Sequence, residues 1–344
     1  MEKKYKLTEE TINVCGRTLH RIEALKDFGD VKKGDKGGFI ENENNLSQSG
    51  DCWVYDNVMV YGNANVYGDA KVYYNAEVCG NAKIYDNAEV FGKAMVYDNA
   101  KIHNHASVCG DARVYGSAEV YGNAEVYGDA KIYGNARVCE NAVVCGNASI
   151  YDKAMVYGYA KVHDYAEVYE TARVYGNAKV RGNAMVYGDA VVCDNAKVWM
   201  DAKVRGKAKI FDNVRIYDNA KVYDDAVVYG NSEVFGNARV CDNTKVFCDA
   251  AVFGNARVYG NAVIYEDAMV YDNADIYGNA RVYGNAKICG NAMIYGNAMV
   301  CGNAIVCGNA EVYDNGAVYG MAMVYGNAEI YGDREVHGNE KVGE

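Results

Sequence analysis

The 344-residue chain carries 46 acidic and 35 basic residues, which gives a net charge of −11, and it contains no proline. Because the two signs are interspersed, this composition argues against a general nucleic-acid-binding protein. No apolar run approaches the roughly 18 residues that would span a bilayer, and no apolar segment follows the charged start. We therefore expect neither a membrane anchor nor a secretory signal.

Residues 1–53 are predicted to form an N-terminal cap. The apolar segments Ile12–Cys15 and Leu19–Ile22 flank Gly16-Arg17, a pattern typical of a short hairpin. Ile40 and Leu46 begin an irregular first coil, and an eight-residue step then leads to Val54, which indicates a two-residue bulge. A cap is needed because the open end of a coil is an unpaired sheet edge.

A six-residue repeat follows in residues 54–344. Every sixth residue from Val54 to Val342 is Val or Ile, and a small residue, usually Ala, stands four positions later. In the unit 130–135, Ala-Lys-Ile-Tyr-Gly-Asn, side chains alternate between small or branched apolar and charged or aromatic. This alternation predicts a strand of about four residues with Ala and Ile inward and Lys and Tyr outward. The Gly-Asn pair suits a sharp corner, because both residues tolerate positive φ.

Three six-residue sides close one triangular coil, so the coil repeats with every third unit. The predicted architecture is therefore all-β: a single-stranded parallel β-helix, or triangular solenoid, of about 16 regular coils. Ala, Val and Ile fill its narrow interior. Since that interior is dry, any chemistry has to occur on the outer wall.

The pattern of an aliphatic residue followed four positions later by a small residue resembles that of the hexapeptide-repeat family, and the resemblance covers residues 54–344. It implies a left-handed parallel β-helix. It implies little about activity, because the family includes acyltransferases, carbonic anhydrases and non-enzymes.

The N-terminal segment carries a second resemblance. Asp27–Lys32, Gly37–Ile40 and Asn45–Asp56 look like the start of a bacterial and prophage-associated group, usually labelled hexapeptide transferases or polymer-forming proteins. The long, insertion-free body is more regular than we would expect for an enzyme of that group.

Acyltransferases of the hexapeptide family use a catalytic His at the cleft between subunits of a trimer. His103, His105 and His163 are the candidates here; His103 and His163 take the place of the outward Tyr, and His105 lies at a corner. They have no partner carboxylate at a fixed spacing, so surface substitution is the simpler interpretation. No third His could complete a zinc site of the carbonic anhydrase kind. We expect no metal and no cofactor.

Residues three units apart stack on one face, which divides the outward Tyr positions into three rows. One row holds the most Tyr residues: Tyr97, Tyr115, Tyr133, Tyr151, Tyr169, Tyr187, Tyr259, Tyr277, Tyr295, Tyr313 and Tyr331. Tyr is large, stiff and amphipathic, so this face is the candidate surface for self-association or a protein partner. The alternative is that Tyr is merely a good exposed strand former.

Basic residues stack beside this row at Lys203, Lys221, Arg239 and Arg257, with Arg205 next to them. Stacked like charges repel, so the pattern offers a weak anion-binding candidate. Nearby corner residues Asp212, Asp218 and Asp224 are the alternative source of compensation.

Most of the twelve cysteines replace the outward Tyr, which favours unpaired thiols in a reducing cytoplasm. The sequence thus predicts a non-catalytic structural or binding rod that self-associates, as a trimer or a filament, or binds a protein partner. The alternative is an acyltransferase that uses acyl-CoA at a subunit interface. Ice binding fits poorly because Thr ladders are missing.

Overall fold

The computed structural model describes residues 2–343 and divides them into two compact units, one ending at Thr171 and one beginning at Ala172. In the described residues the secondary structure consists of β-strands and one short 3₁₀ helix, η1 (Glu43–Asn45). The predicted all-β class is confirmed. Among these residues, no helix has the length and apolarity needed to cross a bilayer.

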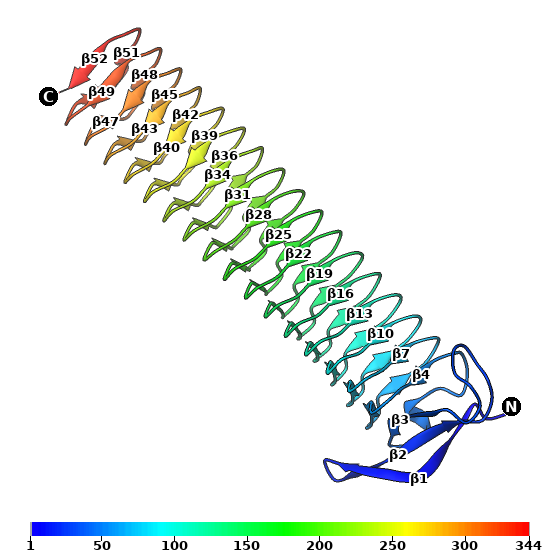
Figure 1. The fold of residues 1–344 in the computed structure, drawn as a ribbon. Coiled ribbons are helices and arrows are strands. Elements are labelled where there is room, and N and C mark those ends of the chain that lie inside the picture. Colours follow the sequence, from blue (N-terminus) through cyan, green and yellow to red (C-terminus); the bar gives the residue numbers. More distant parts are fainter. Residues whose placement is uncertain (1, 344) are drawn as a thin grey trace. The chain divides into compact units, whose positions relative to one another are not determined.

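The first unit opens with an antiparallel hairpin of β1 (Tyr5–Val14) and β2 (Arg17–Ala24), coloured dark blue in Figure 1. Its turn is Cys15-Gly16, both at positive φ, so the predicted hairpin is confirmed but its turn lies one residue earlier than expected. Strand β3 (Lys36–Ile40) pairs antiparallel with β2 and parallel with β5 (Met59–Val60). Strand β3 thus connects the hairpin to the first coil through its pairing with both.

The irregular first coil is also confirmed. Ile40 pairs with Val60 and Leu46 with Val66, whereas Val54 pairs with Val72. The separation between paired residues therefore shortens by two after Leu46, which places the two-residue bulge between Leu46 and Val54. From there the register is constant.

The regular strands begin at β4 (Trp53–Val54) and recur every six residues to β51 (Glu335–Val336) and β52 (Lys341–Gly343). Each has two residues, except for the three-residue strands β49 (Met323–Tyr325) and β52. They are shorter than the four residues expected. The hydrogen bonding nevertheless continues beyond them: the amides of Lys131, Tyr133 and Asn135 all donate to carbonyls of the next turn.

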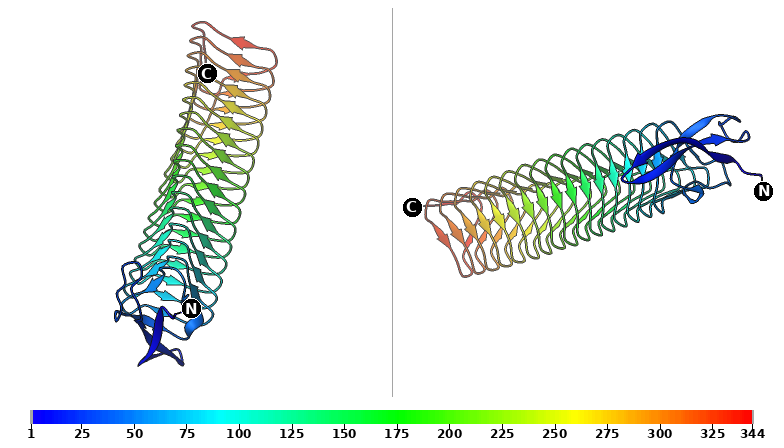
Figure 2. Two further views of the ribbon diagram at one scale, coloured as in Figure 1. Left: turned by 90° about the vertical axis from the view of Figure 1, so that its right-hand side faces the viewer. Right: turned by 90° about the horizontal axis from the view of Figure 1, so that it is seen from below.

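From β4 onward, the strands of each unit pair in parallel with the strand three further along the chain, so three rows of strands surround one interior. In the first unit β4, β7 (Lys71–Val72) and β10 (Glu89–Val90) follow one another in this way, as Figures 1 and 2 show. In the second unit β29 (Lys203–Val204), β32 (Lys221–Val222) and β35 (Arg239–Val240) do the same. Each unit is a parallel β-solenoid with three strands per turn, and the repeat comprises about 17 turns with the irregular first one.

The interior is apolar, as predicted. The inward positions, such as Ala130, Ile132 and Val222, have no exposed surface. Two polar residues at small-residue positions, Ser232 and Thr244, donate their hydroxyls to the carbonyls three residues earlier. Burial of branched side chains, at about 1.5–3 kcal/mol each, is the main stabilising contribution of every turn.

The corners are held by a contact that links successive turns. The first corner residue has a positive φ, near 70° for Gly278 and 58° for Asp272. At many corners where this residue is acidic, its carboxylate accepts a hydrogen bond from the corresponding corner amide of the next turn, as Asp272 does from Gly290 at 3.1 Å. Asp98, Asp218 and Asp242 make the same bond. The carboxylate thus offsets the strain that a non-glycine residue meets in this conformation.

The second corner residue, usually Asn, forms a further ladder. The amide of Asn63 donates to Asn81, and Asn81 to Asn99, each at 3.0 Å. In the second unit the same bonds run through Asn237, Asn255 and Asn273. Each such Asn retains one amide hydrogen for solvent or a ligand.

Candidate functional site: aromatic ladders and a basic groove

The predicted Tyr ladder is present in the first unit, where Tyr97, Tyr115, Tyr133, Tyr151 and Tyr169 stack ring on ring. Successive ring centroids are 4.8 or 4.9 Å apart and the interplanar angles are 1–5°. The rings are half-buried by one another. They form a stiff strip with one polar tip per turn.

The second unit carries a ladder of the same kind over Tyr259, Tyr277, Tyr295, Tyr313 and Tyr331, with centroids 4.9–5.4 Å apart. Tyr187 lies on this row as well, since its amide donates to the carbonyl of Val204. Between them the row is interrupted by Arg205, whose guanidinium lies 4.7 Å from the ring centroid of Tyr223. All eleven Tyr residues proposed for the surface therefore lie where the register places them.

Aromatic ladders are not confined to the predicted row. In the second unit Trp199, Tyr217, Phe235, Phe253 and Tyr271 stack on another row. On the third row Phe211, Tyr229, Phe247, Tyr265 and Tyr283 do so. Counting Tyr alone concealed these ladders, because Phe and Trp occupy the same outward position. The predicted row carries more phenol hydroxyls than the other two, although Tyr217 and Tyr319 on those rows also donate to glutamates.

Several of those hydroxyls bind a carboxylate of the next turn. Tyr151 donates to Glu167 at 2.9 Å, Tyr295 to Glu311 and Tyr313 to Glu329, both at 3.0 Å, and Tyr61 donates to Glu77. Burial, followed by the hydrogen bond to Glu329, raises the pKa of Tyr313 to about 12. These phenols remain neutral donors at physiological pH.

The predicted basic row lies in the second unit on β29, β32, β35 and β38 (Arg257–Val258), which pair in register. It borders a groove of about 740 Å³. The groove is lined by Lys203, Lys221, Arg239, Asn183, Asn219, Asn237, Asn255, Met185 and Asp201. Arg257 pairs with Asp275 at 3.8 Å, beyond the groove.

Two of the corner aspartates considered as compensation for the basic row bond backbone amides of the next turn. Asp212 and Asp218 accept hydrogen bonds from the amides of Gly230 and Gly236, both at 3.0 Å. In the described residues, no carboxylate lies within 4.0 Å of the cationic groups of Lys203, Lys221 or Arg239. Asp212 and Asp218 thus bond backbone amides, and the three cations make no ion pair with a carboxylate in the described part of the chain.

The three candidate catalytic histidines lie in different settings. His103 is stacked between Tyr85 and Tyr121, with centroids 4.7 and 5.1 Å away. His105 is an exposed corner residue. His163 Nδ1 lies 3.2 Å from Asp164 Oδ1, so this histidine has a carboxylate beside it, although the three candidates share none at a fixed spacing. The adjacent position of the two residues was the signal in the sequence.

Two further clusters escaped the sequence patterns. Asp224, Cys241 and Asp242 bring three donor atoms within 4.8 Å of one another. Burial raises the pKa of the Cys241 thiol, so at neutral pH this group offers a metal ion two exposed carboxylates and a weak protonated ligand. All twelve cysteines are free thiols, and burial together with its neighbour Cys289 raises the pKa of Cys307.

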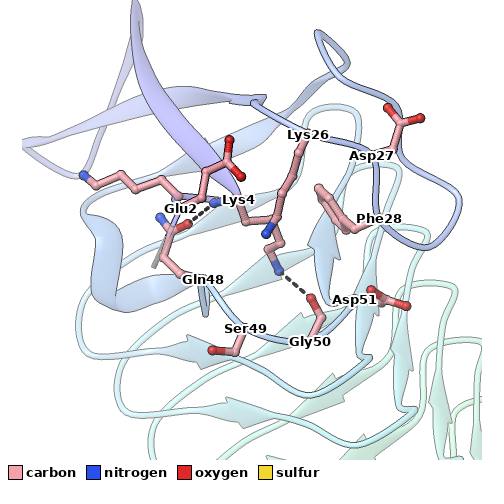
Figure 3. A pocket seen from close by; sticks show the side chains of 10 residues that line it. Glu2, Lys4, Lys26, Asp27, Phe28, Gln48, Ser49, Gly50 and Asp51 are labelled. Atoms are coloured by element: carbon pink, nitrogen blue, oxygen red, sulfur yellow. Dashed lines mark hydrogen bonds between the residues drawn. The ribbon is translucent and has the colours of Figure 1, made fainter.

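The second cluster lies beside a cavity of about 800 Å³ near the hairpin, shown in Figure 3. Lys4 is buried there, and its ammonium donates to the carbonyls of Gly50 and Cys52 at 3.2 and 2.8 Å. The Phe28 ring centroid lies 4.9 Å away, and burial lowers the pKa of Lys4. The lysine thus satisfies carbonyls at the exposed edge of the first coil, which is the function expected of a cap.

The register, the three rows of parallel strands and the Val, Ile and Ala interior define each unit as a β-solenoid repeat protein. The family model described as the YdcK beta solenoid repeat matches residues 130–146, 250–266, 276–290, 286–302 and 292–308. A curated relative from Escherichia coli (strain K12), described as "Uncharacterized acetyltransferase YdcK", is 47% identical over 45 residues. This match spans 13% of the chain and 14% of the relative's length. Both findings agree with a hexapeptide-repeat-like solenoid and with the resemblance to bacterial proteins labelled as transferases.

Proposed function

We propose that this protein is a non-catalytic scaffold that associates with itself or with a protein partner through its Tyr ladder. The observation that carries the proposal is the stacking of half-exposed Tyr rings at 4.8–5.4 Å, with hydroxyls anchored to glutamates. Such rings are already ordered, so a partner would bind them at little further cost in side-chain entropy. The proposal includes the left-handed coil and the bacterial or prophage origin implied by the resemblance, and the cytoplasmic location expected from the unpaired cysteines.

The test compares two pairs of stacked Tyr residues in the second unit. Tyr277→Thr with Tyr295→Thr removes adjacent rungs of the proposed surface, and Tyr265→Thr with Tyr283→Thr removes adjacent rungs of another row. Thr is chosen because it also favours strands. Mass is measured by sedimentation equilibrium over a range of concentrations.

We expect the native protein and the control pair to associate with rising concentration, and the ladder pair to stay monomeric. If both variant pairs lose association equally, association depends on exposed aromatic side chains in general and not on the proposed Tyr ladder. If the native protein is monomeric at every concentration, self-association is contradicted. Binding to a protein partner is then tested with immobilised native and variant chains.

A second candidate function is acyl transfer from acyl-CoA at a subunit interface. The description of the relative as an acetyltransferase and the contact between His163 and Asp164 favour it, because a carboxylate can orient an imidazole as a general base. The test is release of the CoA thiol from acetyl-CoA with amine and hydroxyl acceptors. Turnover that is lost in His163→Ala and kept in His337→Ala, a residue stacked on Tyr319, would support it and contradict the scaffold proposal.

A further inference from the structure

The basic groove of the second unit is chemically distinct from the Tyr ladder. Lys203, Lys221 and Arg239 project from three consecutive paired strands, so their spacing follows the strand spacing of about 4.8 Å. Charges of one sign at this distance repel one another. Arg257, the next cation in the row, is paired with Asp275, and the three that line the groove have no such partner among the described residues.

A second row of polar groups faces the same groove. Asn219, Asn237 and Asn255 lie at the corners beside the cations. Asn237 donates to Asn255 at 3.0 Å, but no hydrogen bond joins the side chain of Asn219 to its described neighbours in the ladder. The ladder is therefore open beside Lys221. The side-chain amide of Asn219 can therefore donate a hydrogen bond to a ligand and accept one from it.

The remaining lining residues mark one end of the groove. Asp201 accepts the side-chain amide of Asn183 at 3.0 Å and is the corner residue of the turn that carries Lys203. Its carboxylate repels an anion, so the attraction is strongest towards Lys221 and Arg239, where the corner residues are Asn219 and Asn237. Because the whole chain carries a charge of −11, this local row is what would attract an anionic ligand.

We propose that the groove binds an acidic polysaccharide that carries one carboxylate on each sugar. Carboxylates repeating once per sugar along an extended chain would meet successive cations, because the length of a pyranose unit is close to the strand spacing. The sugar hydroxyls would exchange hydrogen bonds with the amide row. The site requires neither the Tyr ladder nor its proposed partner.

Other linear anions fit the spacing less well. Phosphates of a nucleic-acid duplex rise by about 3.4 Å along the axis but follow a helical path, which leaves a straight row of cations. Acidic side chains on one face of an extended peptide recur at about 6.8 Å, twice the rise per residue. Single-stranded nucleic acids bind through aromatic platforms, whereas the groove is lined by amides, cations, one aspartate and one methionine.

The test uses the full chain and an oligogalacturonate of defined length as the probe, with its fully methyl-esterified form as the neutral counterpart. Binding is measured by titration calorimetry at low salt. We expect the acid to bind, and the ester to bind about tenfold more weakly or worse, since charge-assisted hydrogen bonds to the carboxylates are lost. This comparison needs no variant. Equal binding of acid and ester overturns the proposal, as does no binding of the acid.

Variants then locate the site. Lys203→Gln, Lys221→Gln and Arg239→Gln are combined, and Lys197→Gln, Lys209→Gln and Lys245→Gln form a control triple with the same charge change on other rows. We expect about a tenfold loss for the groove triple and a small effect for the control. Asn219→Ala, which changes no charge, is expected to weaken binding several-fold. Equal losses in both triples, or tighter binding of single-stranded DNA of equal charge, would contradict the assignment.

Discussion

The phenol of Tyr151 donates a hydrogen bond of 2.9 Å to Glu167, which lies 16 residues later in the next turn. The same bond recurs at Tyr295 with Glu311 and at Tyr313 with Glu329. Because Tyr and Glu belong to adjacent turns, each bond ties one turn to the next on the outside of the solenoid. The ladder is thus stabilised by polar contacts as well as by stacking.

Replacing Tyr151 by Phe keeps the ring stack and removes this bond. We expect the free energy of unfolding to fall by about 1 kcal/mol, because the acceptor is charged but partly exposed to solvent. Chemical denaturation measures the change. Tyr133→Phe is the matched control, since Tyr133 stacks in the same ladder and its hydroxyl has no protein partner among the described residues. Equal effects of the two substitutions would assign the stabilisation to the phenol's hydration alone.

Alkaline pH is expected to weaken the solenoid through the same contacts. Burial, followed by the hydrogen bond to Glu233, raises the pKa of Tyr217 to about 12. In the unfolded chain the phenol pKa is about 10. The native state therefore binds more protons between these values, and its contribution, fully present below about pH 10, is lost as pH rises towards 12.

Unfolding free energy measured against pH should accordingly decline in that interval. Glu233→Gln should shift the ionisation of Tyr217 to lower pH. The tyrosinate absorbance of Tyr217 is identified by comparison with the spectra of Tyr217→Phe. A titration that Glu233→Gln leaves unmoved would show that burial alone sets this pKa.

The corner contact gives a third prediction. A Cβ atom at Gly278 would lie 2.9 Å from the amide nitrogen of Gly296, in a conformation with φ near 70°. Gly278→Ala should cost about 1–2 kcal/mol, the usual penalty for left-handed backbone. Gly278→Asp should cost less, because its carboxylate can accept the amide of Gly296 as Asp272 accepts that of Gly290. Thermal denaturation of the two variants ranks them, and a less stable Asp variant would contradict the corner contact.

The architecture followed from the sequence because the repeat itself encodes it. Val and Ile at every sixth position, with Ala four residues later, fix both the inward face and the register of three units per turn, and the pairing of Val60 with Val78 confirms it. The bulge after Leu46 was visible for the same reason, as a break in an otherwise constant step.

Contacts between outward side chains were harder to predict. The pattern placed Asp218 near the basic row, but it could not show that the carboxylate turns to the amide of Gly236. Nor could it place Lys4 against Cys52, because that contact joins residues outside the repeat. Orientation and long-range contacts in the cap depend on packing that no period describes.

A fourth prediction concerns Cys289 and Cys307, which occupy the same outward position in adjacent turns. The amide of Cys289 donates to Val306 at 3.0 Å, so the two residues lie on neighbouring paired rungs. The strand spacing of about 4.8 Å falls within the Cα separation that disulfides accept. Treatment with diamide should therefore join these two thiols, with Cys241 as the control that has no cysteine on an adjacent turn of its row.

Mass spectrometry of peptides from the non-reduced protein detects the bond. The raised pKa of Cys307 makes the thiolate scarce at neutral pH, so the reaction should accelerate as pH rises. Cys289→Ser should abolish it and leave Cys307 open to alkylation. Cross-linking of Cys241 at the same rate would mean that exposure governs oxidation and that the pairing of turns does not.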